Sequence, residues 1–259
     1  MYNKNELIND LRNIGLKDDD EVLIHSSKRS VNADAKDILD AIESVVCNGL
    51  IVFPTHTWGY IKNDGDVFDN NLSESNVGYL TNFARLNGYV RSNHPTHSVC
   101  AKGKNANDFI HLDDISETPC KPDGCHGYFK NGKILFLGAP LSKNTFIHSI
   151  EEEMNVPDRF TEKKYSFLSQ GDSIYEYNIY RHFNAKCPHI SDNYEKLLPI
   201  FLELNIAKYG KIGDSDSYLV DGKKCYELVK YLLKRDIHIF DDMREIKKSY
   251  IEDFRRDIF

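Results

Sequence analysis

Short apolar runs alternate with amphipathic segments along the first 155 residues. The runs at Glu21–His25, Leu50–Pro54 and Lys133–Leu137 are continuously apolar, which is typical of strands that are buried on both faces. Between the first two runs, Asp34–Cys47 repeats apolar side chains at helical spacing, and Asn5–Ile14 does the same at the start of the chain. This strand–helix–strand order predicts an α/β fold whose parallel strands are joined by right-handed crossovers.

Weaker patterns lie between the second and third apolar runs. The spacing of apolar residues predicts short helices at Gly78–Leu86 and Asn105–Ile110, and short strands at Tyr89–Arg91 and Val99–Gly103. Tyr60–Ser75 is polar, and we interpret it as a surface loop. The sequence therefore predicts that strands and short helices continue to alternate up to the third run.

The pattern changes after residue 155. Lys164–Arg181 alternates apolar and polar residues around Gln170, Gly171 and Asp172, which predicts an antiparallel hairpin. The remaining predicted elements are a helix at Asn193–Ile206 with a kink at Pro199, a loop and strand at Gly210–Val220, and helices at Lys224–Arg235 and Asp241–Arg256. We expect a single domain over residues 1–259, with a core of residues 1–155 and a hairpin and helical part at residues 156–259.

Composition narrows the functional classes. Of 259 residues, 41% are hydrophobic and 28% charged, which is ordinary for a globular protein, and the net charge of -7 argues against nucleic acid as a main partner. The closest pair of the six cysteines, Cys120 and Cys125, has no matching second pair and so does not form a zinc motif. No apolar run reaches membrane-spanning length, and we expect a cytoplasmic protein that binds no membrane.

The segment after Lys133–Leu137 carries the clearest candidate chemistry. Asn144 and Thr145 can cap a helix that runs to about Met154, and on it His148 and Glu151 lie three residues apart on one face. A carboxylate beside a histidine orients the ring and stabilises the imidazolium, which suits a general base. The spacing is equally common on surface helices without a catalytic role.

Other polar residues follow the predicted strands. Histidines and hydroxyl residues occur in HSS at 25–27, THTW at 55–58 and SNHPTHS at 92–98. Ligands bind at such strand ends in open α/β sheets. No phosphate-binding glycine motif and no serine-nucleophile motif accompanies them.

Segments distributed along the chain match a known pattern. They are VLIHSS at 22–27, GLIVFPTHTW at 49–58, RSNHPTHSV at 91–99, LGAPLSKNTFIHSIE at 137–151 and GKIGDSDSYLV at 210–220. In order and separation they resemble the antibiotic N-acetyltransferase family, typified by the aminoglycoside 3-N-acetyltransferases. The third and fourth segments are the specific ones, similar to the patterns R-S-x-H-P-x-x-S and L-G-x(5)-[NV]-T-x-x-H-x-x-E.

The resemblance implies a fold, a reaction and a site. The fold would be a central mixed sheet flanked by helices, with a smaller C-terminal region that contains the antiparallel hairpin. The reaction would transfer acetyl from acetyl-coenzyme A, as a co-substrate, to an amino group of an amino sugar or aminoglycoside-type acceptor, without a metal or a covalent enzyme intermediate. His148 would be the general base and Glu151 its partner.

The same resemblance implies two sets of binding residues. The coenzyme would bind at the polar strand ends, and the expected residues are Ser26, Ser27, Lys28, Ser30, Val31, His94, His97 and Ser98. The amine acceptor would contact residues on the other segments, and those expected are His56, Trp58, Thr145, Arg181 and His182. The sequence leaves the oligomeric state open, a homodimer included.

The chain departs from the family pattern in one place, and the sequence leaves two alternative functions open. Aminoglycoside-modifying members tend to carry acidic residues after the hairpin, whereas this chain has Arg181 and His182 there, which favours a smaller amine or an amino sugar with its own anionic group. One alternative is a metal-dependent hydrolase built on the histidines of the strand ends, His25, His56, His94 and His97. The other is a relative that binds ligands but has lost the reaction.

Overall fold

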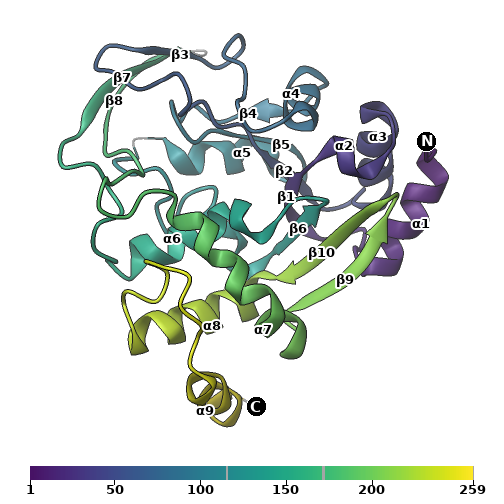
Figure 1. The fold of residues 1–259 in the computed structure, drawn as a ribbon. Coiled ribbons are helices and arrows are strands. Elements are labelled where there is room, and N and C mark those ends of the chain that lie inside the picture. The colour runs from purple at the N-terminus through teal and green to yellow at the C-terminus, as the bar shows by residue number, and fades with distance from the viewer. Residues whose placement is uncertain (115, 171–172, 259) are drawn as a thin grey trace.

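A seven-stranded mixed sheet forms the centre of the molecule (Figure 1). The computed structural model describes residues 1–114, 116–170 and 173–258. The strands run in the order β4-β5-β2-β1-β6-β10-β9. Their bounds are β1 Glu21–Ser26, β2 Leu50–Pro54, β4 Val90–Arg91, β5 Val99–Gly103, β6 Lys133–Leu137, β9 Ala207–Ile212 and β10 Ser215–Asp221.

The three continuously apolar runs form the middle of this sheet. β1 pairs in parallel with β2 on one side and with β6 on the other. β5 and β10 flank these strands in antiparallel orientation, and β4 and β9 pair antiparallel at the two edges. The predicted α/β class with a central mixed sheet is therefore confirmed.

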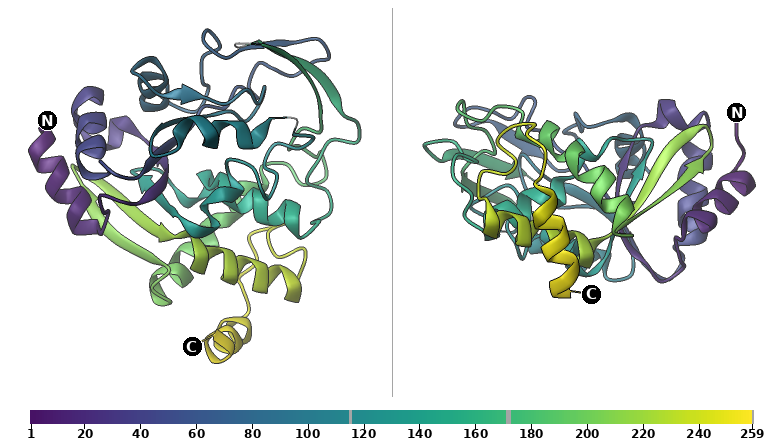
Figure 2. Two further views of the ribbon diagram at one scale, coloured as in Figure 1. Left: turned by 180° about the vertical axis from the view of Figure 1, so that it is seen from behind. Right: turned by 60° about the horizontal axis from the view of Figure 1, so that its bottom comes forward.

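Helices cover both faces of the large sheet. One face carries α1 (Lys4–Ile14), α3 (Ala35–Val45) and α4 (Tyr79–Leu86). The opposite face carries α5 (Ala106–Ile110), α6 (Thr145–Glu153), α7 (Leu198–Glu203), α8 (Gly222–Arg235) and α9 (Lys248–Ile258). Figure 2 shows α8 and α9 far from the N-terminal helices, with the sheet between the two groups.

Burial on both faces explains why the middle strands contain no polar alternation. In β1, Leu23 packs into the core beneath α6 and α8, whereas Val22 and Ile24 pack into the core beneath α1 and α3. β6 divides in the same way, with Phe136 on one side and Leu135 on the other. Successive side chains of a strand point to opposite faces, so each face removes its own set of apolar side chains from water.

A second, three-stranded sheet stands apart from the first, at the upper left of Figure 1. It consists of the predicted antiparallel hairpin, β7 (Tyr165–Gln170) and β8 (Ile174–Ile179), and of β3 (Val67–Asp69) paired in parallel with β7. Gly171 and Asp172 of the predicted turn lie outside the described residues. Phe68 of β3 is fully buried in a small separate core, so Tyr60–Ser75 is not only the surface loop that the sequence predicted.

Two predicted elements of the C-terminal part were wrong. The single kinked helix at Asn193–Ile206 is a 3-10 segment, Ile190–Leu197, followed by α7, in which Pro199 lies in the first turn. A proline there loses no hydrogen bond, so it begins a helix rather than bending one. Residues 241–247 are not helical, and α9 begins at Lys248.

The predicted loop before the last strand was also wrong. Residues 207–212 form β9, which pairs with β10 at the edge of the large sheet. Gly210 interrupts the strand pattern because α1 approaches there, and a β-carbon on Gly210 would lie 3.1 Å from Ile14. Because β9 and β10 join the large sheet through β6, part of the segment 156–259 completes the central core.

Short one-turn helices complete the described structure. They are α2 (Lys28–Val31), which the sequence did not predict, and the 3-10 segments His111–Asp113, Gly127–Asn131 and Leu141–Lys143. None of the helices in the described part of the chain has both the length and the apolar composition that crossing a membrane requires.

Candidate active site

A cavity of about 480 Å³ opens at the carboxyl ends of the parallel strands. Its wall includes His25 and Ser26 at the end of β1, Pro54 and His56 at and after the end of β2, and Ala139 just after β6. Parallel strands direct their carboxyl ends to the same edge of a sheet, where ligands of open α/β folds bind. Thr96 and His97, from the loop between β4 and β5, also line the cavity, so the three polar segments that the sequence analysis named, at 25–27, 55–58 and 92–98, meet at one place.

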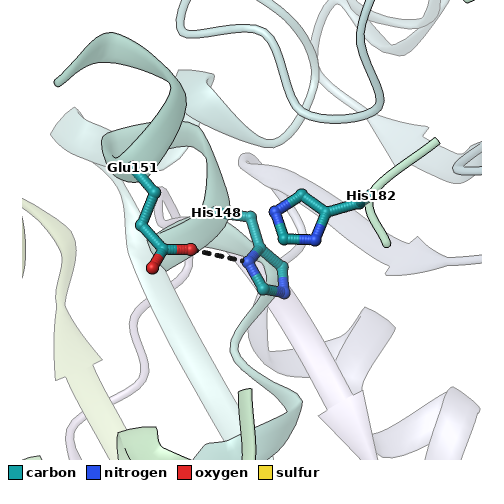
Figure 3. A group of neighbouring side chains, drawn as sticks. All are labelled: His148, Glu151 and His182. Atoms are coloured by element: carbon teal, nitrogen blue, oxygen red, sulfur yellow. Dashed lines mark hydrogen bonds and ion pairs between the residues drawn. The ribbon is translucent and has the colours of Figure 1, made fainter. Parts of the chain in front are cut away.

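Helix α6 brings the candidate base to this cavity. His148 lies in the second turn of α6 and lines the cavity, while Glu151 is fully buried behind it (Figure 3). The predicted side-chain cap is absent, because Asn144 makes no capping hydrogen bond to α6. Packing of Phe146, Ile147 and Ile150 into the core holds the helix instead.

A hydrogen-bonded cluster fixes the tautomer of His148. Its Nδ1 lies 3.0 Å from Glu151 Oε2 and 2.7 Å from the hydroxyl of Tyr194, and that hydroxyl lies 2.6 Å from the same carboxylate oxygen. A carboxylate only accepts, so Tyr194 donates its proton to Glu151, and the imidazole Nδ1 carries the hydrogen that Glu151 and Tyr194 accept. The lone pair of the neutral ring is then on Nε2, for which no hydrogen bond is recorded among the described residues.

Glu151 is held in its charged form by a second partner. Arg159 donates from Nε to Glu151 Oε1 at 2.8 Å and from a terminal nitrogen to Asp241 at 2.7 Å, and its side chain is almost completely buried. Burial by itself raises the pKa of the Glu151 carboxyl. The hydrogen bond with His148 and the charges of His148 and Arg159 outweigh burial and lower this pKa to about 2. Glu151 therefore remains an anion at neutral pH.

Sequence reasoning missed Tyr194 and Arg159. Tyr194 comes from the 3-10 segment after the hairpin, 43 residues from Glu151, and Arg159 from the loop after α6. No local spacing links them to the helix. The available signal was indirect: a buried carboxylate requires a cation and donors, and an arginine eight residues from Glu151 could supply one.

His182 packs directly against His148, the candidate base. The ring centroids of His148 and His182 are 3.9 Å apart (Figure 3). Phe160 meets His182 edge-on. Burial, followed by the neighbouring His148, lowers the pKa of His182 well below its ordinary value. His182 Nε2 is buried without a hydrogen-bond partner. The two residues that sequence reasoning assigned to different roles, base and acceptor contact, therefore form one cluster.

The geometry around Glu151 bears on metal binding. His148, Glu151 and His182 each offer a potential ligand atom, and within the described ranges these atoms lie within 4.8 Å of one another. Both oxygens of Glu151 already accept hydrogen bonds from the protein, and Arg159 places a positive charge beside them. A carboxylate so occupied suits the orientation of an imidazole better than the coordination of a cation.

The histidines of the hydrolase alternative are arranged differently. Within the described residues, His25, His56, His94 and His97 do not bring three potential ligand atoms as close together as His148, Glu151 and His182 do. His94 accepts from the backbone N–H groups of Thr96 and His97 through Nδ1, which is a structural role in the loop.

The expected coenzyme residues fall into three groups. Ser26 and His97 line the cavity. Ser27 and Ser30 bond to each other through their hydroxyls at 2.9 Å, on the turn that carries Lys28. The remaining side chains are buried off the cavity wall, and they are Val31, His94 and Ser98. For Val31, whose side chain is in the core, only the backbone could meet a ligand.

The expected acceptor residues are all on the cavity wall. They are His56, Trp58, Thr145, Arg181 and His182. Trp58 is 46% exposed, so its ring stands at the rim rather than in the core. The predicted acceptor residues and His148, the predicted base, are thus brought to the same cavity as the end of β1.

The sequence is similar to those of known proteins. Residues 23–234 match the model of the family described as aminoglycoside 3-N-acetyltransferase. Aminoglycoside N(3)-acetyltransferase IX of Micromonospora chalcea is 26% identical over 251 residues, covering 84% of this chain and 88% of that protein. Aminoglycoside N(3)-acetyltransferase VII of Streptomyces paromomycinus is 25% identical over 252 residues, covering 85% and 87%.

Solved structures share the fold. Aminoglycoside acetyltransferase AAC(3)-Xa superposes with a TM-score of 0.78 at 20% identity, covering 91% of this chain and 94% of that one. The binary complex of AAC-IIIb with CoASH gives a TM-score of 0.77 at 23% identity, covering 90% and 97%. The family match extends over the large sheet, α6 and the hairpin, and the chain therefore belongs to the aminoglycoside 3-N-acetyltransferase family of acyltransferases.

Proposed function

We propose that this protein transfers acetyl from acetyl-coenzyme A to an amino group of an amino sugar-type acceptor, with His148 as the general base. One observation carries the proposal. His148 lines the cavity, and its Nδ1 is fixed by Glu151 and Tyr194, which leaves the lone pair on Nε2 for a substrate. The family relatives are named as N(3)-acetyltransferases of aminoglycosides, which supports the same reaction class.

The residues supply the proton chemistry that the reaction needs. A protonated amine has no lone pair, so it attacks the thioester carbonyl only when its proton leaves for a base. His148 Nε2 takes that proton, and the anionic Glu151 stabilises the imidazolium that results. The C–N bond forms and the C–S bond breaks. The proton on the imidazolium passes to the departing thiolate, and the nitrogen loses its second proton to water, so that the products are a neutral amide and a thiol. The histidine is neutral again after each turnover.

The tetrahedral intermediate of acetyl transfer carries an oxyanion, and few groups of the loop before α6 have a hydrogen free to donate to it. Within the loop 138–145, the backbone N–H groups of Gly138, Ser142, Lys143 and Asn144 already donate to protein acceptors. Thr145 lines the cavity at the first position of α6, where helix N–H groups have no intrahelical partner, and its hydroxyl makes only a long contact of 3.4 Å. We propose that Thr145, through its backbone N–H and its hydroxyl, donates hydrogen bonds to the oxyanion that forms on the thioester carbonyl oxygen.

We place the coenzyme at the end of β1 and the following turn. Ser26 and His97 face the cavity, and Lys28 adds a positive charge suited to a phosphate. The complex of AAC-IIIb with CoASH, which has the same fold, supports a coenzyme site in this architecture. Ser27, Ser30, Val31, His94 and Ser98 complete the proposed set through hydroxyl, ring or backbone groups.

The test measures the release of free thiol from acetyl-coenzyme A across a panel of amines. The wild type should release coenzyme A only when an amine is present, and the chemical step should fall about 10²–10⁴-fold in His148→Gln, the usual contribution of a positioned base. The His148→Gln protein should retain its melting temperature and the stabilisation that coenzyme A provides.

The alternatives predict other outcomes. Stabilisation by coenzyme A without turnover of any amine indicates a binding relative. Hydrolysis that depends on an added metal indicates the hydrolase. A stable His148→Gln protein with near wild-type turnover removes His148 from the mechanism, whichever amine is used.

A further inference from the structure

The cavity wall carries positive charge in a protein whose net charge is -7. Lys62, Lys143 and Arg181 line the cavity, and within the described part of the chain no carboxylate is recorded in an ion pair with any of the three. The only carboxylate on the wall among the described residues is Asp158, and Lys186 pairs with it at 3.0 Å. The charge on this wall is therefore opposite in sign to that of the whole molecule.

The fourth cation on the wall does not add to this charge. Arg159 is neutralised by Glu151 and Asp241, both within 2.8 Å. Glu151 in turn is enclosed behind His148 and Tyr194, so neither group of the pair is free to bind a ligand. The charge available to a ligand comes from the three cations without carboxylate partners.

Arg181 lies on the segment that directly follows the small sheet. It precedes His182, whose ring lies against His148, and its guanidinium lies over the ring of Tyr165 at 5.7 Å and 3.5 Å from the backbone carbonyl of Lys62. Those contacts hold the guanidinium beside Lys62 without neutralising it. Lys62 and Arg181 flank the small sheet, whereas the proposed coenzyme turn follows β1 of the large sheet.

We propose that the acceptor is an amine that also carries an anionic oxygen group, a carboxylate or a phosphate, which Arg181 binds with the help of Lys62. The inference rests on the proposed acetyl transfer and specifies its acceptor. The planar guanidinium donates two parallel hydrogen bonds to either group. A polycationic acceptor meets three like charges on this wall and only one carboxylate, itself paired with Lys186.

The test uses matched amines that differ in charge. Glucosamine, glucosamine 6-phosphate, galactosaminuronic acid and kanamycin are titrated into the complex with coenzyme A by calorimetry, and each is assayed for acetylation. One or both anionic amines should bind about 10- to 100-fold more tightly than glucosamine, the range for a hydrogen bond to a charged group. The preference should shrink as salt is raised, because it is electrostatic. The phosphate and carboxylate arms identify which group the site prefers.

Substitutions on and off the cavity wall test whether Arg181 causes the preference for anionic amines. Arg181→Gln should weaken the binding of the anionic amines far more than that of glucosamine, so that most of the preference, measured as the ratio of the two affinities, is lost. Lys164→Gln is the matched control, because Lys164 directly precedes β7 of the same hairpin, pairs with Glu117 at 2.8 Å and lies off the cavity wall. It should retain the full preference.

The outcomes separate this inference from the proposed function. Kanamycin as the tightest and fastest acceptor, or an anionic preference that survives Arg181→Gln, overturns the inference while the acetyl transfer stands. Tight, Arg181-dependent binding of an anionic amine that is never acetylated supports the charge assignment and overturns the transfer.

Discussion

At the scale of single residues, the tautomer of His148 is decided by one phenol. Glu151 alone could accept from either protonated nitrogen of a ring that rotates, but Tyr194 lies within 2.7 Å of both Nδ1 and the carboxylate. Its hydroxyl donates to Glu151 and accepts from Nδ1, so both of its hydrogen-bonding functions are used. Burial, and then the charge of Glu151, raises the pKa of Tyr194 well above its ordinary value, which keeps the phenol protonated.

Tyr194→Phe tests this role. The variant removes the second acceptor from His148 Nδ1 and one donor from Glu151, while the aromatic ring still fills the core. We expect the turnover rate to fall about tenfold, as for the loss of one or two hydrogen bonds of 0.5–1.5 kcal/mol each, with little change in the KM for acetyl-coenzyme A. Steady-state kinetics with the acetyl acceptor in excess measure both quantities.

Tyr128→Phe is the matched control, since Tyr128 donates to Glu21 at 2.9 Å in the same kind of tyrosine–carboxylate contact, off the cavity wall. It should lose a comparable hydrogen bond and keep the wild-type rate. Equal losses of rate in the two variants would show that Tyr194 acts only through general stability.

The individual residues of the site also show how much of it could be predicted from the sequence. His148 and Glu151 were identifiable because a helix fixes the relation between residues three apart. Tyr194 and Arg159 reach the same carboxylate from separate segments, and their positions depend on how the whole core packs. Of the expected acceptor residues, Arg181 and His182 reach the cavity because the segment after the hairpin returns there, which the family resemblance implied and local spacing did not.

At the scale of elements, the turn after β6 sets the direction in which the chain approaches α6. Gly138 adopts a positive φ of 64° just after the strand, where a β-carbon would lie 2.8 Å from Ser30 and 2.9 Å from Ser215. The neighbouring atoms belong to the turn after β1 and to the start of β10. Three elements around the cavity therefore depend on this residue having no side chain.

Gly138→Ala should destabilise the protein by about 1–3 kcal/mol, through both the left-handed backbone and the two close contacts. Gly88→Ala is the control, because Gly88 has a positive φ of 85° and nothing within 4 Å of a built β-carbon, and it should show only the backbone effect. Urea unfolding of both variants measures the difference. A Gly138→Ala protein no less stable than Gly88→Ala would show that the neighbours move aside freely.

Elements were predicted best where burial is symmetrical. β1, β2 and β6 were recognised because both of their faces are buried, and a continuously apolar run shows this directly. β9 was taken for a loop because Gly210 permits the approach of α1, a reason that is visible only in three dimensions. β3 has three residues and depends on pairing with β7, about a hundred residues later.

At the scale of the whole molecule, burial of histidines couples folding to pH. Burial is the largest effect that lowers the pKa of His25 to about 3, of His94 to about 4 and of His126 to about 3. It also lowers the pKa values of His56, His97 and His182 well below the ordinary range. These rings are neutral in the folded state at pH 5, whereas in the unfolded chain they are protonated below about 6.5.

Two buried carboxyl groups have the opposite effect on how stability depends on pH. Burial raises the pKa of Asp113 to about 6 and of Glu152 to about 7, so the folded state holds protons there that the unfolded chain has released above about pH 4. Between pH 4.5 and 6, the six buried histidines bind protons in the unfolded chain but not in the folded protein, whereas the two carboxyls bind protons in the folded protein but not in the unfolded chain. It therefore binds more protons than the folded protein, and stability rises with pH over this range.

We predict that the free energy of unfolding falls steeply as the pH drops below about 6.5, with each buried histidine contributing about 1.4 kcal/mol per pH unit until its folded-state pKa is reached. His126→Gln should reduce the slope between pH 5 and 6 by about that amount, because the substituted side chain does not titrate. Urea unfolding at half-unit pH steps gives these slopes. A free energy of unfolding that stays constant from pH 7 to 5 would mean that the histidines are hydrated, and so able to protonate, in the folded state.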